Sequence, residues 1–225
     1  MKERSIILFV IVSLFINTSL IAQTVDNKLA FGINGTSTEY YGDYGNGFLR
    51  LDRIYSGLGF SVNGYLSPSF DMGIQGSFGK YGYFTSITDR FLGNKFDLSL
   101  FGHYKLNNGL ILGKYNKLSP FLSLGLGFAT YSRAVEYDFG TFPTIITGGA
   151  DLIIPIGAGI KYQLSEGFAL QYQYLYNFTN HDNRDENQHL GATVNTNNRN
   201  DAFGTHALSI IFSFVSLPGR SCQCQ

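Results

Sequence analysis

The sequence of 225 residues contains no tryptophan, two cysteines and five prolines. Charged residues make up 14% of the chain, whereas ordinary soluble domains contain about 25%. Basic and acidic residues number 16 each, so the formal net charge is zero, which excludes a strongly basic nucleic-acid binder. Two cysteines cannot form a disulfide scaffold or a cysteine zinc site. After residue 23 no apolar run reaches about 18 residues, so a transmembrane helix is excluded there.

Aromatic residues and glycine are abundant instead. The chain has 20 Phe, 15 Tyr and 27 Gly, and 44% of its residues are hydrophobic. Its length is that of a single domain. Many aromatics, much glycine and few charges together predict a β-rich protein whose outer surface faces something other than water.

Residues 1–22 have the organisation of a secretory signal peptide. Lys2 and Arg4 form a positive start, an apolar stretch runs from Ser5 to Phe15, and a more polar stretch ends at Ala22. This order predicts cleavage after Ala22. The alternative is an uncleaved anchor helix, but the apolar stretch is short for a membrane span of about 20 residues.

The two cysteines, Cys222 and Cys224, lie in the last four residues. A bridge between them would be strained because only one residue separates them. We therefore interpret residues 218–225 as a short periplasmic tail, with pairing to a partner's cysteine as the alternative. The remaining residues, 23–217, form the predicted domain.

A period of two residues runs through this domain, which is the pattern of β-strands. In the clearest segment, 168–178, aromatic and leucine side chains occupy every second position and Gln171 and Gln173 lie between them. Similar alternation predicts eight strands in all, within residues 31–36, 57–63, 70–79, 96–105, 122–129, 153–162, 168–178 and 206–214.

In these eight segments one face is bulky and apolar without charges, and the other carries Gly, Ser, Gln, Asn and the few charges. A soluble barrel or sandwich would place its large apolar side chains inside. The opposite arrangement predicts an all-β fold, an eight-stranded antiparallel up-and-down transmembrane β-barrel, closed because open sheet edges cannot lie in hydrocarbon. The residues expected to face lipid include Leu124, Leu126, Leu170, Tyr172, Tyr174, Leu208, Ile210 and Phe212.

The connections between the predicted strands alternate in length. Those at 38–54, 81–94, 131–151 and 179–203 are longer and are expected outside the cell, whereas those at 66–69 and 163–167 are short turns. The connection at 106–120 is intermediate in length and breaks the clean contrast. This arrangement places the N- and C-termini in the periplasm. Aromatics near the strand ends are expected to form two interfacial girdles: Tyr40, Tyr41, Tyr81, Tyr83, Phe84, Tyr131, Tyr162, Tyr176, Phe178, Phe212 and Phe214.

Four segments carry a resemblance to a known family: Tyr40 to Asp43, Tyr65 to Asp71, Phe168 to Tyr174 and Phe212 to Phe214. Together they resemble the N-terminal barrel of outer-membrane protein A-type proteins of Gram-negative bacteria. The resemblance covers about residues 25–217 and implies eight strands and an outer-membrane location. Many members continue into a periplasmic peptidoglycan-binding domain, whereas this chain stops at Gln225. A short relative, or one that works beside another envelope component, is therefore expected.

The barrel interior is the candidate functional site. Asp71 begins one predicted strand and Lys105 ends the next, so these two side chains are expected to meet in the periplasmic layer of the lumen, with Lys161, Gln75 and Gln173 nearby. A structural, charge-paired plug is the favoured interpretation, because an eight-stranded lumen is only just wide enough for side chains. An ion path with a switchable ion pair is the alternative.

Other chemistry finds little support in the sequence. Residues 179–203 contain His181, Asp182, Asp185, Glu186 and His189, but their spacing matches no known metal motif. No serine is placed beside His103 or His206 as nucleophilic catalysis would need. We therefore expect no catalytic residue, cofactor or metal. The expected partners are outer-membrane lipid, lipopolysaccharide and an envelope protein complex, with no nucleic acid. A non-enzymatic scaffold is the leading hypothesis, a narrow pore the second, and a lipid-modifying enzyme the third.

Overall fold

The computed structural model describes residues 29–41, 55–86, 89–113, 116–135, 145–165, 167–180 and 202–214. Side chains are described for these ranges except at 83–86, 89–91, 133–135, 145–147 and 214. The predicted signal peptide and the tail with both cysteines lie outside the described residues. Within the described part, no helix is long and apolar enough to cross a membrane.

Eight antiparallel strands form one closed barrel in which each strand pairs with its neighbours in sequence and β1 pairs with β8. This confirms the predicted fold class. The strands contain between 11 and 21 residues. They are β1 (Leu29–Tyr41), β2 (Tyr55–Tyr65), β3 (Phe70–Ser86), β4 (Asp89–Lys105), β5 (Leu118–Val135), β6 (Ile145–Ser165), β7 (Phe168–Thr179) and β8 (Ala202–Phe214).

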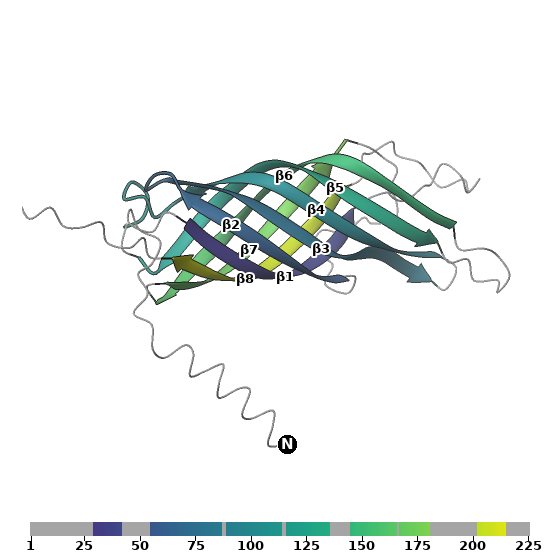
Figure 1. Cartoon of the computed structure of the whole chain (residues 1–225), viewed down its shortest axis with the longest axis horizontal. Coiled ribbons are helices and arrows are strands. Elements are labelled where there is room, and N and C mark those ends of the chain that lie inside the picture. Colours follow the sequence, from purple (N-terminus) through teal and green to yellow (C-terminus); the bar gives the residue numbers. More distant parts are fainter. Residues whose placement is uncertain are drawn as a thin grey trace, which may run out of the picture.

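The strand register fixes the width of the barrel. A path that starts at Leu29 and follows paired residues through all eight strands returns to β1 at Glu39, ten residues further along. With ordinary strand spacing, this offset gives a strand tilt of about 40° and a backbone radius of about 8 Å. Figure 1 shows the strands wrapping obliquely around the long axis. Such a lumen is filled by side chains.

Leu29 of β1 pairs with Phe214 of β8, so the start of the first strand and the end of the last strand lie at the same end of the barrel. We name this end the turn end, because the short β2–β3 and β6–β7 connections also lie there. The opposite end, which holds the β1–β2 and β7–β8 connections, is the loop end.

The side-chain alternation has the predicted sense. Outward leucines on β5 are strongly exposed, with 59% for Leu124 and 55% for Leu126, whereas inward Ser123 is 4% exposed. On β8, Leu208 is 54% exposed and Ser209 is 2% exposed. The other residues expected to face lipid also lie on the outer surface: Leu170, Tyr172, Tyr174, Ile210 and Phe212. The exterior is apolar and the interior is largely polar, which is the inverse of a soluble protein.

The strands are longer than predicted, and two predicted long connections are wrong. Instead of a connection at 81–94, β3 continues to Ser86 and β4 begins at Asp89, with a bulge between Phe84 and Ser86. The predicted connection at 131–151 shortens to 136–144. The antiparallel ladder continues past the apolar band, where outward residues such as Lys80 are polar, so a criterion based on apolar alternation ends each strand too early.

Three aromatics expected in the interfacial girdles lie inside the barrel instead. Tyr81 is 0% and Tyr40 is 6% exposed, and the two rings lie 6.5 Å apart in the lumen with the partly buried Tyr131 packed against them. Strand parity explains the difference, because Tyr40 shares a face with inward Asn34, and Tyr81 shares a face with inward Ser77. Tyr83, Phe84 and Phe214 have no described side chain.

Large rings and glycines pack together in the interior. Phe101 and Phe121 are 4% and 3% exposed and point into the lumen. A Cβ at Gly73 would lie 2.9 Å from Cζ of Phe101, and a Cβ at Gly159 would overlap the ring of Phe121. These inward glycines therefore provide the volume that the rings fill, as expected when small and large residues alternate in a narrow barrel.

Candidate functional site

The turn-end layer of the lumen contains the predicted Asp71 and Lys105. Lys105 Nζ lies 2.6 Å from Asp71 Oδ1, and the two side chains are 14% and 6% exposed. The same ammonium lies 4.4 Å from the ring centre of Tyr65. The carboxylate and the aromatic face therefore share the positive charge of Lys105 in a largely dry environment.

Lys161 on β6 and His103 on β4 belong to this layer. Lys161 is close enough to Asp71 and Lys105 to interact electrostatically with both. The imidazole of His103 lies between the rings of Phe101 and Phe121, with centroid distances of 4.4 Å and 4.3 Å. His103 Nε2 has no hydrogen-bond partner among the described residues. Two aromatic rings, from β4 and the adjacent β5, thus hold the imidazole in place inside the lumen.

The two predicted glutamines lie deeper in the interior. Gln173 is 1% exposed; its Nε2 donates to Ser123 Oγ at 3.4 Å, and its Oε1 accepts from Gln171 Nε2 at 3.2 Å. This contact joins β7 to β5 across the inner face of β6, where Gly157 and Gly159 leave room. Gln75 is also buried, on the same face of β3 as Asp71.

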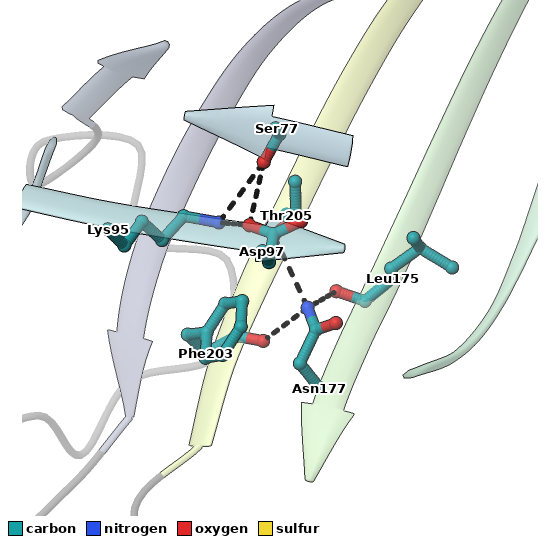
Figure 2. A network of polar contacts seen from close by, with 7 residues as sticks. All are labelled: Ser77, Lys95, Asp97, Leu175, Asn177, Phe203 and Thr205. Atoms are coloured by element: carbon teal, nitrogen blue, oxygen red, sulfur yellow. Dashed lines mark hydrogen bonds and ion pairs between the residues drawn. The ribbon is translucent and has the colours of Figure 1, made fainter. Parts of the chain in front are cut away.

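A second ion pair lies in the lumen nearer the loop end. Lys95 Nζ lies 2.6 Å from Asp97 Oδ2, and the Lys95 side chain is 1% exposed. Ser77 Oγ donates to the same carboxylate oxygen at 2.7 Å. Lys95 also lies 4.5 Å from the ring centre of Phe203 on β8, on the far side of the lumen. Figure 2 shows this network reaching from β3 and β4 toward β8.

Asn177 extends the same network on β7. Its Nδ2 donates to the carbonyl oxygen of Phe203 at 3.0 Å and lies 3.3 Å from Thr205 Oγ1 (Figure 2). The hydrogen bonds of Asn177 join the neighbouring strands β7 and β8, and the contact between Lys95 and the Phe203 ring connects this group to β4 on the opposite wall. This layer was not predicted. The predicted strand began at Phe96, so Lys95 was left outside it. The spacing of Lys95 and Asp97, two residues apart on one strand face, was the available signal.

A third polar group lies on the outer face of β1, β7 and β8. Glu39 shares the outward face of β1 with Phe31 and Ile33, and His206 shares that of β8 with Leu208 and Ile210. Glu39 is nevertheless only 3% exposed. The prediction that the outer face carries no charge is correct for the residue ranges that were predicted as strands. β1 extends beyond its predicted range and adds the Glu39 carboxylate to this face.

Aromatic side chains cover this carboxylate. His206 Nε2 lies 3.1 Å from Glu39 Oε1, and the hydroxyl of Tyr41 donates to Glu39 Oε2. His206 Nδ1 lies 2.7 Å from the hydroxyl of Tyr172, and the hydroxyls of Tyr41 and Tyr174 lie 3.1 Å apart. We name the five residues Glu39, Tyr41, Tyr172, Tyr174 and His206 the outer polar cluster.

The metal-ligating residue types predicted at 179–203 lie outside the described residues. In the described part of the chain, no three His, Cys, Asp or Glu side chains come together as a metal site would need.

No protein-family model and no curated protein sequence matches this chain. The chain is similar in fold to the crystal structure of neisserial surface protein A, with a TM-score of 0.51 and 12% identity over 83% of this chain and 97% of that one. Ail, the attachment invasion locus protein of Yersinia pestis, solved in complex with the heparin analogue sucrose octasulfate, gives 0.49 and 12% over 84% and 100%. The outer-membrane enzyme PagL gives 0.40 and 11% over 81% and 99%. At such identities the likeness concerns the fold alone.

Proposed function

We propose that this protein is a non-enzymatic β-barrel of the Gram-negative outer membrane that stabilises the envelope or presents its loop end to a partner. The observation that carries the proposal is the sidedness of the barrel, with leucine, isoleucine and phenylalanine outside and polar side chains inside. Such an exterior is stable in acyl chains and unstable in water. The expected orientation places the turn end in the periplasm and the loop end at the cell surface.

The lumen supports a scaffold better than a channel. Two ion pairs, Asp71 with Lys105 and Lys95 with Asp97, project from β3 and β4 into a lumen that also holds buried phenylalanine rings. Each layer is held by hydrogen bonds or by an aromatic face, so it blocks the lumen with ordered side chains rather than with mobile ones.

A narrow pore is the second candidate, favoured by one specific observation. Asn34 Oδ1, Ser61 Oγ and Asn63 Oδ1 are buried on the inner wall of β1 and β2 and have no hydrogen-bond partner among the described residues. Buried polar atoms of this kind are usually satisfied by internal water. Water along this wall would offer small solutes a path beside the ion pairs.

Refolding and conductance measurements test both candidates. The purified protein is expected to refold into phospholipid vesicles with the heat-dependent electrophoretic shift of a closed barrel. In planar bilayers we expect no large, stable channel. Lys105→Ala is expected to leave the conductance unchanged, because the Lys95 layer and the phenylalanine rings still fill the lumen.

A several-fold rise in conductance of Lys105→Ala would instead support the pore with a switchable ion pair. A stable monomer obtained in water without detergent would overturn the membrane location itself. Co-purification from native membranes in mild detergent, followed by mass spectrometry, would identify lipopolysaccharide or an envelope protein as the partner.

A further inference from the structure

The β4–β5 connection at the turn end carries strongly exposed aliphatic side chains. Within this connection the structure describes residues 106–113, 116 and 117. Leu110 is 85%, Ile111 is 58% and Leu112 is 37% exposed. We name these three residues the apolar tip. Connections between strands are normally polar, and a contiguous exposed apolar surface marks a site that a membrane or a partner covers.

Hydrogen bonds hold the apolar tip in an ordered conformation. Asn108 is 4% exposed, and its Oδ1 accepts from the backbone N–H groups of Leu110 and Ile111 at 2.9 Å and 3.2 Å. Gly109 has a φ of 87°, which favours glycine, and its N–H donates to the carbonyl oxygen of Leu112 at 2.9 Å. Because the backbone is fixed in this way, the connection cannot collapse to bury the tip, and its side chains stay at the surface.

The connection joins the outer wall of the barrel at the level of an aromatic girdle. Asn108 Nδ2 donates to the hydroxyl of Tyr104 at 3.2 Å, and the Tyr104 ring lies 5.1 Å from that of Phe70, an outward residue that is 49% exposed. On the neighbouring strands outward Leu118 pairs with outward Tyr162. Outward tyrosines next to leucine and phenylalanine mark the boundary between acyl chains and headgroups. The apolar tip is therefore attached to the barrel at this boundary.

Exposed leucines surround the turn end. Leu29 begins β1, Leu66 lies in the β2–β3 turn, and Leu164 lies near the end of β6. They are 45%, 61% and 57% exposed. Together with Leu110 they are distributed around the whole perimeter, because the strands follow one another in sequence around the closed barrel. A protein that docked on one side would leave the other leucines in water, whereas a lipid leaflet contacts all of them.

The charge of the connection also fits a phospholipid surface. Lys117 is exposed, and the sequence from Leu106 to Lys117 contains no acidic residue. A lysine beside exposed aliphatic side chains can keep its ammonium among lipid phosphates while the apolar neighbours enter the leaflet. Apolar side chains, a nearby lysine and a flanking tyrosine girdle are the combination found in segments that lie in a membrane interface.

We propose that the apolar tip inserts into the periplasmic phospholipid leaflet beside the barrel, at the boundary between headgroups and acyl chains. Interfacial segments bury their apolar face about 5–10 Å into this boundary. The tip extends the lipid contact of the barrel beyond its strands on the β4–β5 side and fixes the depth of the turn end. The inference rests on the proposed membrane location and orientation.

Tryptophan fluorescence measures the depth of the tip, because the chain has no tryptophan of its own. The variants Leu110→Trp, Asn116→Trp and Leu124→Trp of the full chain are refolded separately into phosphatidylcholine vesicles whose acyl chains carry bromine either near the glycerol or near the methyl end. We expect Leu110→Trp to emit at shorter wavelength than Asn116→Trp, to be quenched most by bromine near the glycerol, and to lose at least half of the iodide quenching of Asn116→Trp. Asn116 is an exposed polar residue of the same connection, so the preference of tryptophan for interfaces is common to both variants.

A charge at the tip gives a second readout that needs no tryptophan. Because Leu110 is 85% exposed in the protein, Leu110→Asp would be nearly neutral if the tip lay in water. In the leaflet we expect it to raise the equilibrium constant of unfolding in vesicles about fivefold, whereas Asn116→Asp should leave that constant nearly unchanged.

The outcomes separate the tip from the membrane location. If bromine at neither position quenched Leu124→Trp, the membrane location would fail. If Leu124→Trp were quenched by bromine near the methyl end while iodide quenched Leu110→Trp and Asn116→Trp equally, insertion of the tip alone would be overturned. A protein that co-purifies from native membranes with the unmodified chain but not with Leu110→Asp, combined with a tip that lies in water in vesicles, would assign the tip to a protein partner instead.

Discussion

Replacement of Lys95 by alanine is expected to destabilise the barrel by about 3–5 kcal/mol, because it leaves the Asp97 carboxylate buried without its positive partner. The Lys95 side chain is 1% exposed and its ammonium lies 2.6 Å from Asp97. After the substitution only the Ser77 hydroxyl, at 2.7 Å, remains hydrogen-bonded to that carboxylate in this network. Reversible urea unfolding in phospholipid vesicles, followed by electrophoretic mobility, measures the change.

A double variant separates the cost of an unpaired charge from the value of the pair. Lys95→Met combined with Asp97→Leu removes both charges and keeps similar volumes, so it is expected to be close to neutral or stabilising. If the double variant lost as much stability as Lys95→Ala, the ion pair itself would add net stability to the barrel, beyond compensating for the burial of its two charges. If Lys95→Ala itself cost less than about 1 kcal/mol, the site would be hydrated like an exposed ion pair.

The contrast between the two ion pairs shows what sequence periodicity can determine. Asp71 and Lys105 lie within segments where outward apolar residues mark the alternation, so their common face and common end could be predicted. Lys95 lies between outward Asn94 and outward Phe96, and the polar Asn94 interrupts the apolar alternation, which Leu92 continues on the far side. β4 continues beyond its outward apolar residues because its backbone pairs with β3 and β5. The residue composition of β4 does not reveal this pairing.

The outer polar cluster could not be predicted for a different reason. Its geometry depends on the β1–β8 pairing, in which Ser37 lies opposite His206. That pairing is set by the ten-residue offset of the strand register around the closed barrel. The alternation of side chains along a strand is the same for every even offset, so it does not reveal which residues of β1 and β8 lie opposite each other. The burial of Glu39 therefore depends on a global quantity. By contrast, each strand's inward and outward faces are local and were predicted, apart from aromatics such as Tyr40 and Tyr81 near the strand ends.

Replacement of Leu124 by arginine is expected to cost about 2–4 kcal/mol in a phospholipid bilayer, because it places a charge at the middle of the apolar band. Leu124 is 59% exposed, and the outward residues on either side of it along β5, Leu122 and Leu126, are also more than half exposed. The free energy of unfolding in vesicles, measured by urea titration, gives the cost.

The matched control is Thr130→Arg, which introduces the same side chain on the outward face of the same strand, beyond Phe128, the last residue of its apolar run. At the edge of the band the arginine reaches the headgroup region, so the expected cost is only about 0–1 kcal/mol. The introduced residue is the same at the two positions, so the difference in cost reports the depth in the bilayer together with the loss of the Leu124 side chain. Equal costs, or a neutral Leu124→Arg, would mean that this face does not contact hydrocarbon, and the proposed membrane location would fail with it.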